Sequence, residues 1–188
     1  MNEIELAEGV RAGDDTARKE LYTIYARQLL AVCYRYTGDM DAAHDVLHDG
    51  FIKIFTHFSF RGECALGTWL TRVMATTAID YLRRQQRFEQ MEVHEAWAGE
   101  QAAGVIDEDE NAEATRLGAD LSRGQLMELI ARLPEGCRMV FNLYVFEEKS
   151  HREIAQLLGI REHSSTSQLS RAKALLARMI LDRCKNKE

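Results

Sequence analysis

Apolar residues recur every three or four positions along most of the first 87 residues, which is the spacing of a buried helix face. A short helix is expected at about residues 3–11, before Gly13, and a longer one begins after Asp14 or Asp15, either of which can cap it. Gly38 ends the longer helix. Its apolar stripe consists of Leu21, Tyr25, Leu29, Val32 and Tyr36.

Two further helices follow, with a loop between them. Asp39 caps the first, and the second begins at Gly67 or Thr68. Residues 58–66 separate the two helices and contain two aromatic side chains, an arginine and a glycine. The positions expected to face inward are Ala43, Leu47, Phe51 and Ile54 in the first helix and Leu70, Val73, Thr77 and Tyr81 in the second. A first helical bundle is therefore predicted.

Residues 89–120 interrupt this pattern, because they contain scattered Gly and Ala and no sustained apolar stripe. Ten Asp or Glu and one Arg lie within residues 88–122, a net charge of −9. The whole chain has a net charge of −6, so the other residues together carry +3. An acidic segment without a stripe predicts a flexible linker between two domains.

The helical pattern resumes at residue 121. Pro134 closes one helix and is expected to be the first-turn residue of the next. The apolar stripe before Pro134 consists of Leu126, Leu129, Ile130 and Leu133. In the helix after it, the positions expected to face inward are Val140, Leu143 and Tyr144.

Residues 150–176 predict a helix-turn-helix. Ser150 and Glu153 have the spacing of a capping box, and Gly159 suits the left-handed residue that follows a helix end. After a four-residue turn, Ser164 or Ser165 caps a second helix. The apolar positions of that helix are Leu169, Ala172, Leu176, Met179 and Ile180. The second helix of such a motif can enter a DNA major groove.

The outward face of this second helix carries cations and short hydroxyls, which hydrogen-bond phosphates and base edges. The expected DNA contacts are Arg161, Ser164, Ser165, Thr166, Ser167, Arg171 and Lys173. From residue 150 to the end there are eight Lys or Arg and four Asp or Glu, a net charge of +4. An ordinary helical hairpin with a solvated polar face is the alternative interpretation.

A second candidate site combines aromatic and cationic side chains in the first bundle. Such a combination suits single-stranded nucleic acid, because bases stack on rings while cations hold the backbone. The residues concerned are Phe60, Arg61, Trp69, Arg72, Arg83, Arg84 and Arg87. From the spacing alone, a purely structural role for the aromatic residues in the core of the bundle explains the pattern equally well.

Composition narrows the class of protein. One proline among 188 residues and few strand-like alternations favour an all-α fold. No apolar run reaches the length of a membrane span and the acidic start is unlike a signal peptide, which predicts a cytoplasmic protein. The four cysteines are widely spaced, which favours free thiols over disulfides or a zinc site. His44 and His48, beside Asp45 and Asp49, leave a metal-dependent hydrolase as a further alternative, although the chain has no HExxH motif.

Apart from the linker, nearly the whole chain resembles bacterial RNA polymerase sigma factors of the extracytoplasmic-function (ECF) group. DVLHDGFIKIF is similar to the family's polymerase-binding helix, and GTWLTRVMATTAIDYLRR to the helix that meets the minus-ten region. LPEGCRMVFNLYVFEEKSHREIAQLLGI, followed by TSQLSRAKALL, is similar to the module that reads the minus-thirty-five element. The resemblance implies a region 2-like domain at residues 1–88, an acidic linker at 89–120 and a region 4-like helix-turn-helix domain at 121–188.

This resemblance implies a promoter-reading polymerase subunit that is not an enzyme and needs no cofactor or metal. The polymerase contacts it implies are Asp45, His48, Asp49, Phe51 and Ile52. In the family, the loop at residues 58–66 and the start of the next helix capture an extruded base of the nontemplate strand, and a pocket that stacks the base offsets the cost of unstacking. Thr76 stands where the family frequently has Asn and joins the expected minus-ten contacts.

The partners implied by the resemblance are core RNA polymerase, promoter DNA and an anti-sigma factor, often membrane-bound, with no small-molecule substrate. The alternative is a helix-turn-helix transcription regulator that binds an operator without being a polymerase subunit. Such a regulator should carry a ligand-binding or phospho-acceptor domain with alternating strands and helices, and the pattern of residues 1–87 indicates helices only.

Overall fold

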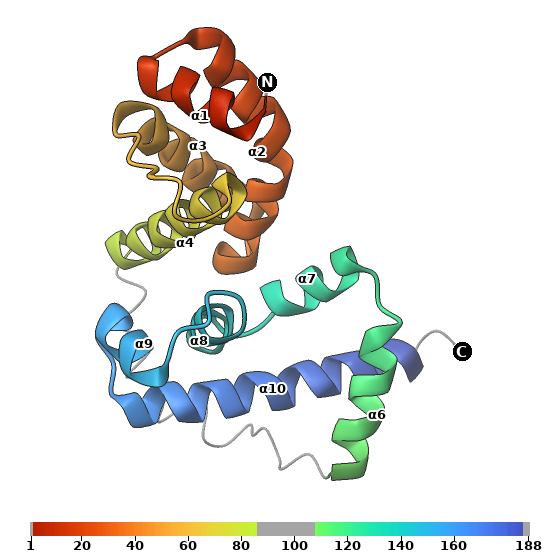
Figure 1. Ribbon diagram of the computed structural model, residues 1–188. Helices are drawn as coiled ribbons and strands as arrows, with labels where there is room; N and C mark the ends of the chain where they lie inside the picture. The colour runs from red at the N-terminus through yellow and green to blue at the C-terminus, as the bar shows by residue number, and fades with distance from the viewer. Residues whose placement is uncertain (1, 86–107, 186–188) are drawn as a thin grey trace. The chain divides into compact units, whose positions relative to one another are not determined.

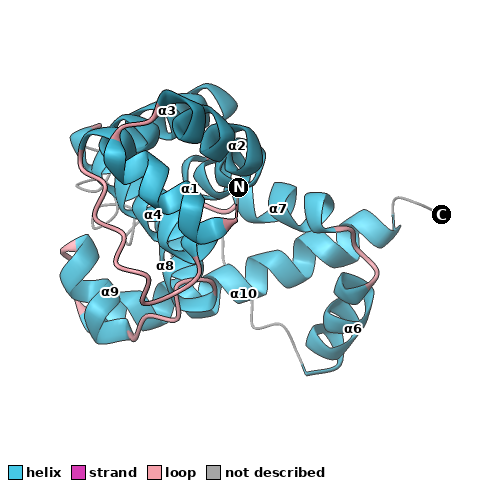
Figure 2. Cartoon of the chain, turned by 45° about the horizontal axis from the view of Figure 1, so that its top comes forward, coloured by secondary structure: helices cyan, strands magenta, loops and turns pink. Residues whose placement is uncertain are grey.

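The computed structural model describes residues 2–85 and 108–185, and every regular element within these ranges is a helix (Figures 1 and 2). The chain divides into two compact units, Met1–Arg84 and Gln85–Glu188. The predicted all-α fold with two small helical domains is thereby confirmed. Among the described residues, no helix combines the length and the apolar character needed to cross a bilayer.

The first unit is a bundle of four helices. They are α1 (Glu3–Ala12), α2 (Asp15–Thr37), α3 (Met40–Thr56) and α4 (Leu66–Arg84). Asp14 and Asp39 accept hydrogen bonds from the first turns of α2 and α3, as their positions before apolar stripes predicted. Gly13 and Gly38 adopt left-handed conformations after α1 and α2. The local sequence therefore sets the ends of these helices.

The core of the first unit lies where α2, α3 and α4 pack together, with α1 against α2. Most of the predicted stripe residues are fully covered, whereas Tyr25, Val73 and Tyr81 are only half-buried. At Gly50, α3 approaches α4 so closely that a Cβ would overlap the side chain of the fully buried Met74. Packing density of this kind holds the outward faces of α3 and α4 in a fixed arrangement.

The second unit is built around one long helix. Its helices are α6 (Glu108–Ala119), α7 (Arg123–Ala131), α8 (Glu135–Val145), α9 (His151–Leu158) and α10 (Glu162–Lys185). The other four pack against α10, as Figure 1 shows. The main apolar cluster joins Leu129 and Ile130 of α7 with Ala172, Leu176 and Ile180 of α10. The predicted stripe of the last helix is thus its buried face, with Met179 at the edge.

The prediction of a linker over the whole of residues 89–120 is wrong at its end, because residues 108–119 form α6. Ala114 of this helix is buried with Ala177 and Leu181 of α10, and Gly118 lies against Ile180. Leu117 packs against this cluster as well, but it is the one large apolar residue of α6 and the other contacts come from small side chains, so the segment shows no recognisable helix stripe. Residues 89–107 of the expected linker lie outside the described residues.

Two predictions for α8 also differ from the structure. Pro134 is the residue before the helix, with a non-helical backbone, rather than part of its first turn. Tyr144 is 40% exposed, whereas Arg138 and Asn142 are buried, as Val140 and Leu143 are. The spacing of apolar residues cannot predict that a polar residue is buried, because such burial depends on hydrogen-bond partners that only the tertiary structure supplies.

Candidate nucleic-acid interface

Three aromatic side chains gather where the loop after α3 meets α4. Phe58 and Phe60 of the loop and Trp69 of α4 have ring centroids 5.2, 5.7 and 6.3 Å apart, with tilted or edge-to-face planes. All three rings are half-buried. Each therefore has one side against the protein and another that remains accessible, which is the geometry of a platform on which a base can stack.

The outward stripe of α4 continues from this aromatic cluster. Trp69, Arg72, Thr76 and Arg83 lie within one side of the helix, because their spacing of three, four and seven residues follows the helical repeat. Arg72, Thr76, Arg83, Arg84 and the loop residue Arg61 are exposed. Arg87, expected to act with them, lies outside the described residues. The structure thus brings the described minus-ten candidates to one face of the first unit.

Hydrogen bonds of Thr76 and Lys53 define the orientation of the outer and inner sides of α4. The Thr76 hydroxyl donates to the carbonyl of Arg72 at 2.9 Å and keeps its lone pairs available to an outside donor. On the inner side, Lys53 of α3 donates to Asp80 and Thr77 of α4, each at 3.3 Å. The outward stripe is therefore fixed in rotation relative to α3.

The helix-turn-helix forms from α9 and α10. Ser150 and Glu153 make the predicted capping box. The Ser150 hydroxyl and backbone N–H both donate to the exposed Glu153 carboxylate and lower its pKa. Gly159 is left-handed, at φ 72°, and the N–H groups of Gly159 and Ile160 donate to the carbonyl of Ala155. The chain reverses in three residues, 159–161, and α10 starts at Glu162, before the two serines expected to cap it.

The residues on the outward face of α10, which begins at Glu162, differ from the predicted set. Arg161, Thr166 and Lys173 are exposed, and Ser167 and Arg171 are half-buried. The prediction that Ser164 and Ser165 contact DNA is wrong, because they are 8% and 0% exposed and lie on the inner side of the helix. Ser165 Oγ is hydrogen-bonded to His151 Nδ1 of α9 at 2.9 Å. Its hydroxyl therefore joins the two helices of the motif.

Two exposed residues on the same face were not among the candidates. His163 and Ser170 lie near Thr166 on the helix surface, at spacings of three and four residues. The helical period predicts both positions when the helix begins at Glu162, but not when it begins at Ser164 or Ser165.

Lys173 lies elsewhere on the surface of α10, with its Nζ 5.9 Å from the centre of the Tyr144 ring of α8. Tyr144 in turn stacks on His151, with centroids 4.9 Å apart.

On α3, Asp45, His48 and Ile52 are exposed along one line of the helix, and Asp49 is half-buried. Phe51, predicted to be a polymerase contact, is only 4% exposed and packs between Tyr22 and Phe55, with centroids 4.8 and 5.6 Å away. That prediction is wrong, because the residue belongs to the bundle core. Ile52 is 48% exposed, so much of its apolar side chain lies in water.

The two histidines of α3 lie one helical turn apart. His44 and His48 are both exposed. In the part of the chain that the structure describes, no three His, Cys, Asp or Glu side chains come together in a way that could hold a metal ion.

Comparison with known proteins bears on both units. The Sigma-70 region 2 family model matches residues 21–88, and the Sigma-70 region 4 model matches residues 123–176. The ECF RNA polymerase sigma-E factor of Escherichia coli is 32% identical over 171 residues, 89% of this chain and 88% of that protein. The sigma-E factor of Salmonella typhimurium gives the same values, and the RNA polymerase sigma-H factor of Pseudomonas aeruginosa is 30% identical over 90% of this chain and 89% of its own.

One solved structure also matches over most of the chain, at lower identity. It is the sigma factor RpoE of Bartonella quintana in complex with the anti-sigma factor NepR, with a TM-score of 0.46 and 17% identity over 87% of this chain and 96% of that one. The two family models and the identity to the sigma-E factors over most of the chain show that this protein belongs to the ECF group of RNA polymerase sigma factors, which act in transcription initiation.

Proposed function

We propose that the first unit captures an extruded base of the nontemplate minus-ten strand on the aromatic cluster of Phe58, Phe60 and Trp69, while the second unit reads the minus-thirty-five element with the outer face of α10. The observation that carries this proposal is the continuous stripe of α4, which runs from Trp69 through Arg72 and Thr76 to Arg83. A single strand can stack on the rings at one end and place its phosphates along the cations.

The energetics of strand opening support this arrangement. Extruding a base costs a few kcal/mol of stacking and pairing, and stacking on an aromatic side chain returns about 1–3 kcal/mol per base. The exposed guanidinium groups of Arg61, Arg72, Arg83 and Arg84 add phosphate contacts. Opening then follows from binding energy, and the protein performs no covalent chemistry. On this account it is not an enzyme and needs no cofactor or metal.

The second unit supplies duplex recognition. Arg161, Thr166, Ser167, Arg171 and Lys173 remain as candidate contacts on the accessible side of α10. Arginine forms paired hydrogen bonds with guanine or phosphate, and the hydroxyls hydrogen-bond phosphates or base edges. His151 and Ser165 fix the angle between α9 and α10 and so the depth to which the recognition helix reaches.

Core RNA polymerase is the partner of the α3 surface, through Asp45, His48, Asp49 and Ile52. An exposed isoleucine between polar side chains suits a protein contact, because it buries apolar area that the free chain leaves in water. Family membership also supports an anti-sigma factor, often membrane-bound, as a regulatory partner. Binding to core polymerase and promoter DNA places the protein in the cytoplasm.

The test is transcription in vitro with core polymerase and fragments of the source genome. Promoter-dependent transcripts are expected, and mapping their starts gives the two promoter elements. Trp69→Ala should reduce open-complex formation about tenfold through lost stacking. Arg72→Gln should weaken promoter binding and lower its salt dependence, whereas Arg27→Gln, an exposed arginine on α2, serves as the matched charge control.

Two results would contradict the proposal. One is the absence of promoter-dependent product from every fragment. The other is tight operator binding by the isolated chain with no association with core polymerase, which would favour the conventional helix-turn-helix regulator.

A further inference from the structure

We infer that Arg11 of α1 is a positioning residue for promoter opening, which holds the aromatic loop in its base-capturing conformation before DNA arrives. This inference rests on the proposed function of the loop. It assigns a role to α1, which precedes the residues 21–88 that match the Sigma-70 region 2 model.

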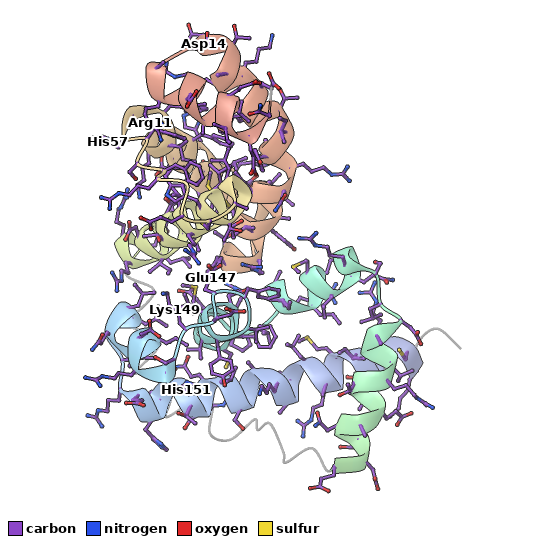
Figure 3. All side chains as sticks on the ribbon, in the orientation of Figure 1. Arg11, Asp14, His57, Glu147, Lys149 and His151 are labelled. Atoms are coloured by element: carbon purple, nitrogen blue, oxygen red, sulfur yellow. The ribbon has the colours of Figure 1, made fainter. Side chains whose placement is uncertain are left out.

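The Arg11 side chain contacts the loop at two neighbouring aromatic residues. Its Nη2 donates to the backbone carbonyl of Phe60 at 2.6 Å, and its Cζ lies 5.7 Å from the centre of the Phe58 ring. Figure 3 labels Arg11 and also His57, the residue that follows α3 and begins the loop. One guanidinium thus holds the loop backbone by a charge-assisted hydrogen bond and one of its rings by a cation–π contact.

Side-chain packing of the aromatic cluster and the Arg11 contact, rather than backbone pairing, hold the loop. Within the described residues, positions 58–64 make no backbone–backbone hydrogen bond, and Gly62 adopts a left-handed conformation with open space around it. The Arg11 bond ties this stretch to another helix. Since each residue without such restraints retains conformational entropy, a freely moving loop would have to be ordered when the base binds, and that cost would weaken binding.

The helix that carries Arg11, α1, is packed closely against the bundle. Leu6, Ala7 and Val10 of α1 are buried, and a Cβ at Gly9 would lie 2.6 Å from Cβ of Ala17, which shows how closely α1 approaches α2. At the other end of the helix, the Tyr25 hydroxyl donates to Glu3 at 3.2 Å. The anchor is therefore fixed relative to the bundle, and the loop is held relative to α4 through it.

The expected consequence of losing Arg11 is specific to single-stranded DNA. Removal of one hydrogen bond and one cation–π contact at an exposed site should weaken binding of the minus-ten strand by about three- to tenfold. Holoenzyme assembly should not change, because the candidate polymerase contacts lie on α3. The salt dependence of binding should also stay the same, since the charge acts on the loop and not on a phosphate.

The experiment compares holoenzymes that carry wild-type chain, Arg11→Gln, Arg11→Lys and the control Arg27→Gln. The probe is a fluorescent single-stranded oligonucleotide with the nontemplate minus-ten sequence of a promoter mapped by transcription in vitro. Anisotropy gives the Kd at several salt concentrations. Arg11→Gln should bind about three- to tenfold more weakly with an unchanged salt slope, Arg11→Lys should fall between it and wild type, and Arg27→Gln should match wild type.

Two outcomes would overturn the role of Arg11. One is wild-type affinity in Arg11→Gln. The other is a loss accompanied by a decrease of about 0.7 in the salt slope, which would mean that Arg11 contacts a phosphate directly. If Arg11→Gln fails to fold, the charge-retaining Arg11→Lys variant decides between the same outcomes. A holoenzyme carrying Trp69→Ala is measured in the same assay, and an affinity equal to that of wild type would instead show that the proposed function of the cluster is wrong.

Discussion

Arg138 provides the sharpest test of how the second unit is held together. It is 7% exposed, and its Nη1 donates to the carbonyls of Ala131 and Leu133, both at 2.8 Å. These carbonyls lie where α7 ends, so they have no partner within that helix. The cation satisfies both and also opposes the negative end of the α7 dipole.

We expect Arg138→Met to lower the free energy of unfolding of this unit by about 2–4 kcal/mol. A hydrogen bond to a charged group contributes about 1.5–3 kcal/mol, and the methionine side chain recovers part of the lost packing while leaving two carbonyls without a donor. Ala131 and Leu133 are 5% and 1% exposed, so water reaches their carbonyls only if the turn opens. Arg132→Gln is the matched control, because its side chain is exposed one residue beyond α7.

Hydrogen exchange of the full-length protein, followed by mass spectrometry, measures this effect unit by unit. The slowest amides of α8 and α10 should exchange about 30- to 1000-fold faster in Arg138→Met, the equivalent of the expected loss at 1.4 kcal/mol per factor of ten, while α2 and α3 remain unchanged. A change of less than threefold in α8 would refute the reasoning, because it would mean that water satisfies the two carbonyls at no cost.

Three further predictions follow from the local structure. Gly159→Ala places a Cβ on a residue at φ 72° and should destabilise the helix-turn-helix by about 1 kcal/mol. Gly124→Ala lies inside α7 with open space around it and should be neutral or stabilising. Thermal unfolding measures both. Ser150→Ala should raise the pKa of Glu153 part of the way toward its ordinary value, measured by NMR titration, because it removes the hydroxyl donor, the largest cause of the lowering, and keeps the backbone N–H. The depressed pKa stabilises the capping box above the ordinary glutamate pKa, and this contribution is lost as the pH falls through the folded-state pKa. Burial raises the pKa of Cys33 to about 12, so at pH 8 the native protein should be alkylated at Cys64 and Cys184 well before Cys33, as peptide mass mapping would show; equal rates at Cys33 and Cys64 would contradict the buried position.

The sequence determined the helices and most of their ends, because these depend on contacts between residues close in the chain. The turn at Gly159, the capping box of Ser150 and Glu153, and the caps at Asp14 and Asp39 all stand where the pattern placed them. The apolar stripes predicted for α3 and α10 are also the buried faces of these helices. Local hydrogen bonds and the helical period suffice for such features.

Other features depended on packing between distant segments. Ser165 was expected on the outward face of its helix, but it is buried and pairs with His151 of another helix. The apolar stripe placed Phe51 inward correctly, and only the resemblance implied a polymerase contact for this residue, which Tyr22 covers. The α6 helix has small residues in place of a stripe, and its burial exists only because α10 is long enough to meet it. The tertiary structure also placed Arg11 beside a loop 49 residues away, a contact that no spacing along the chain could indicate.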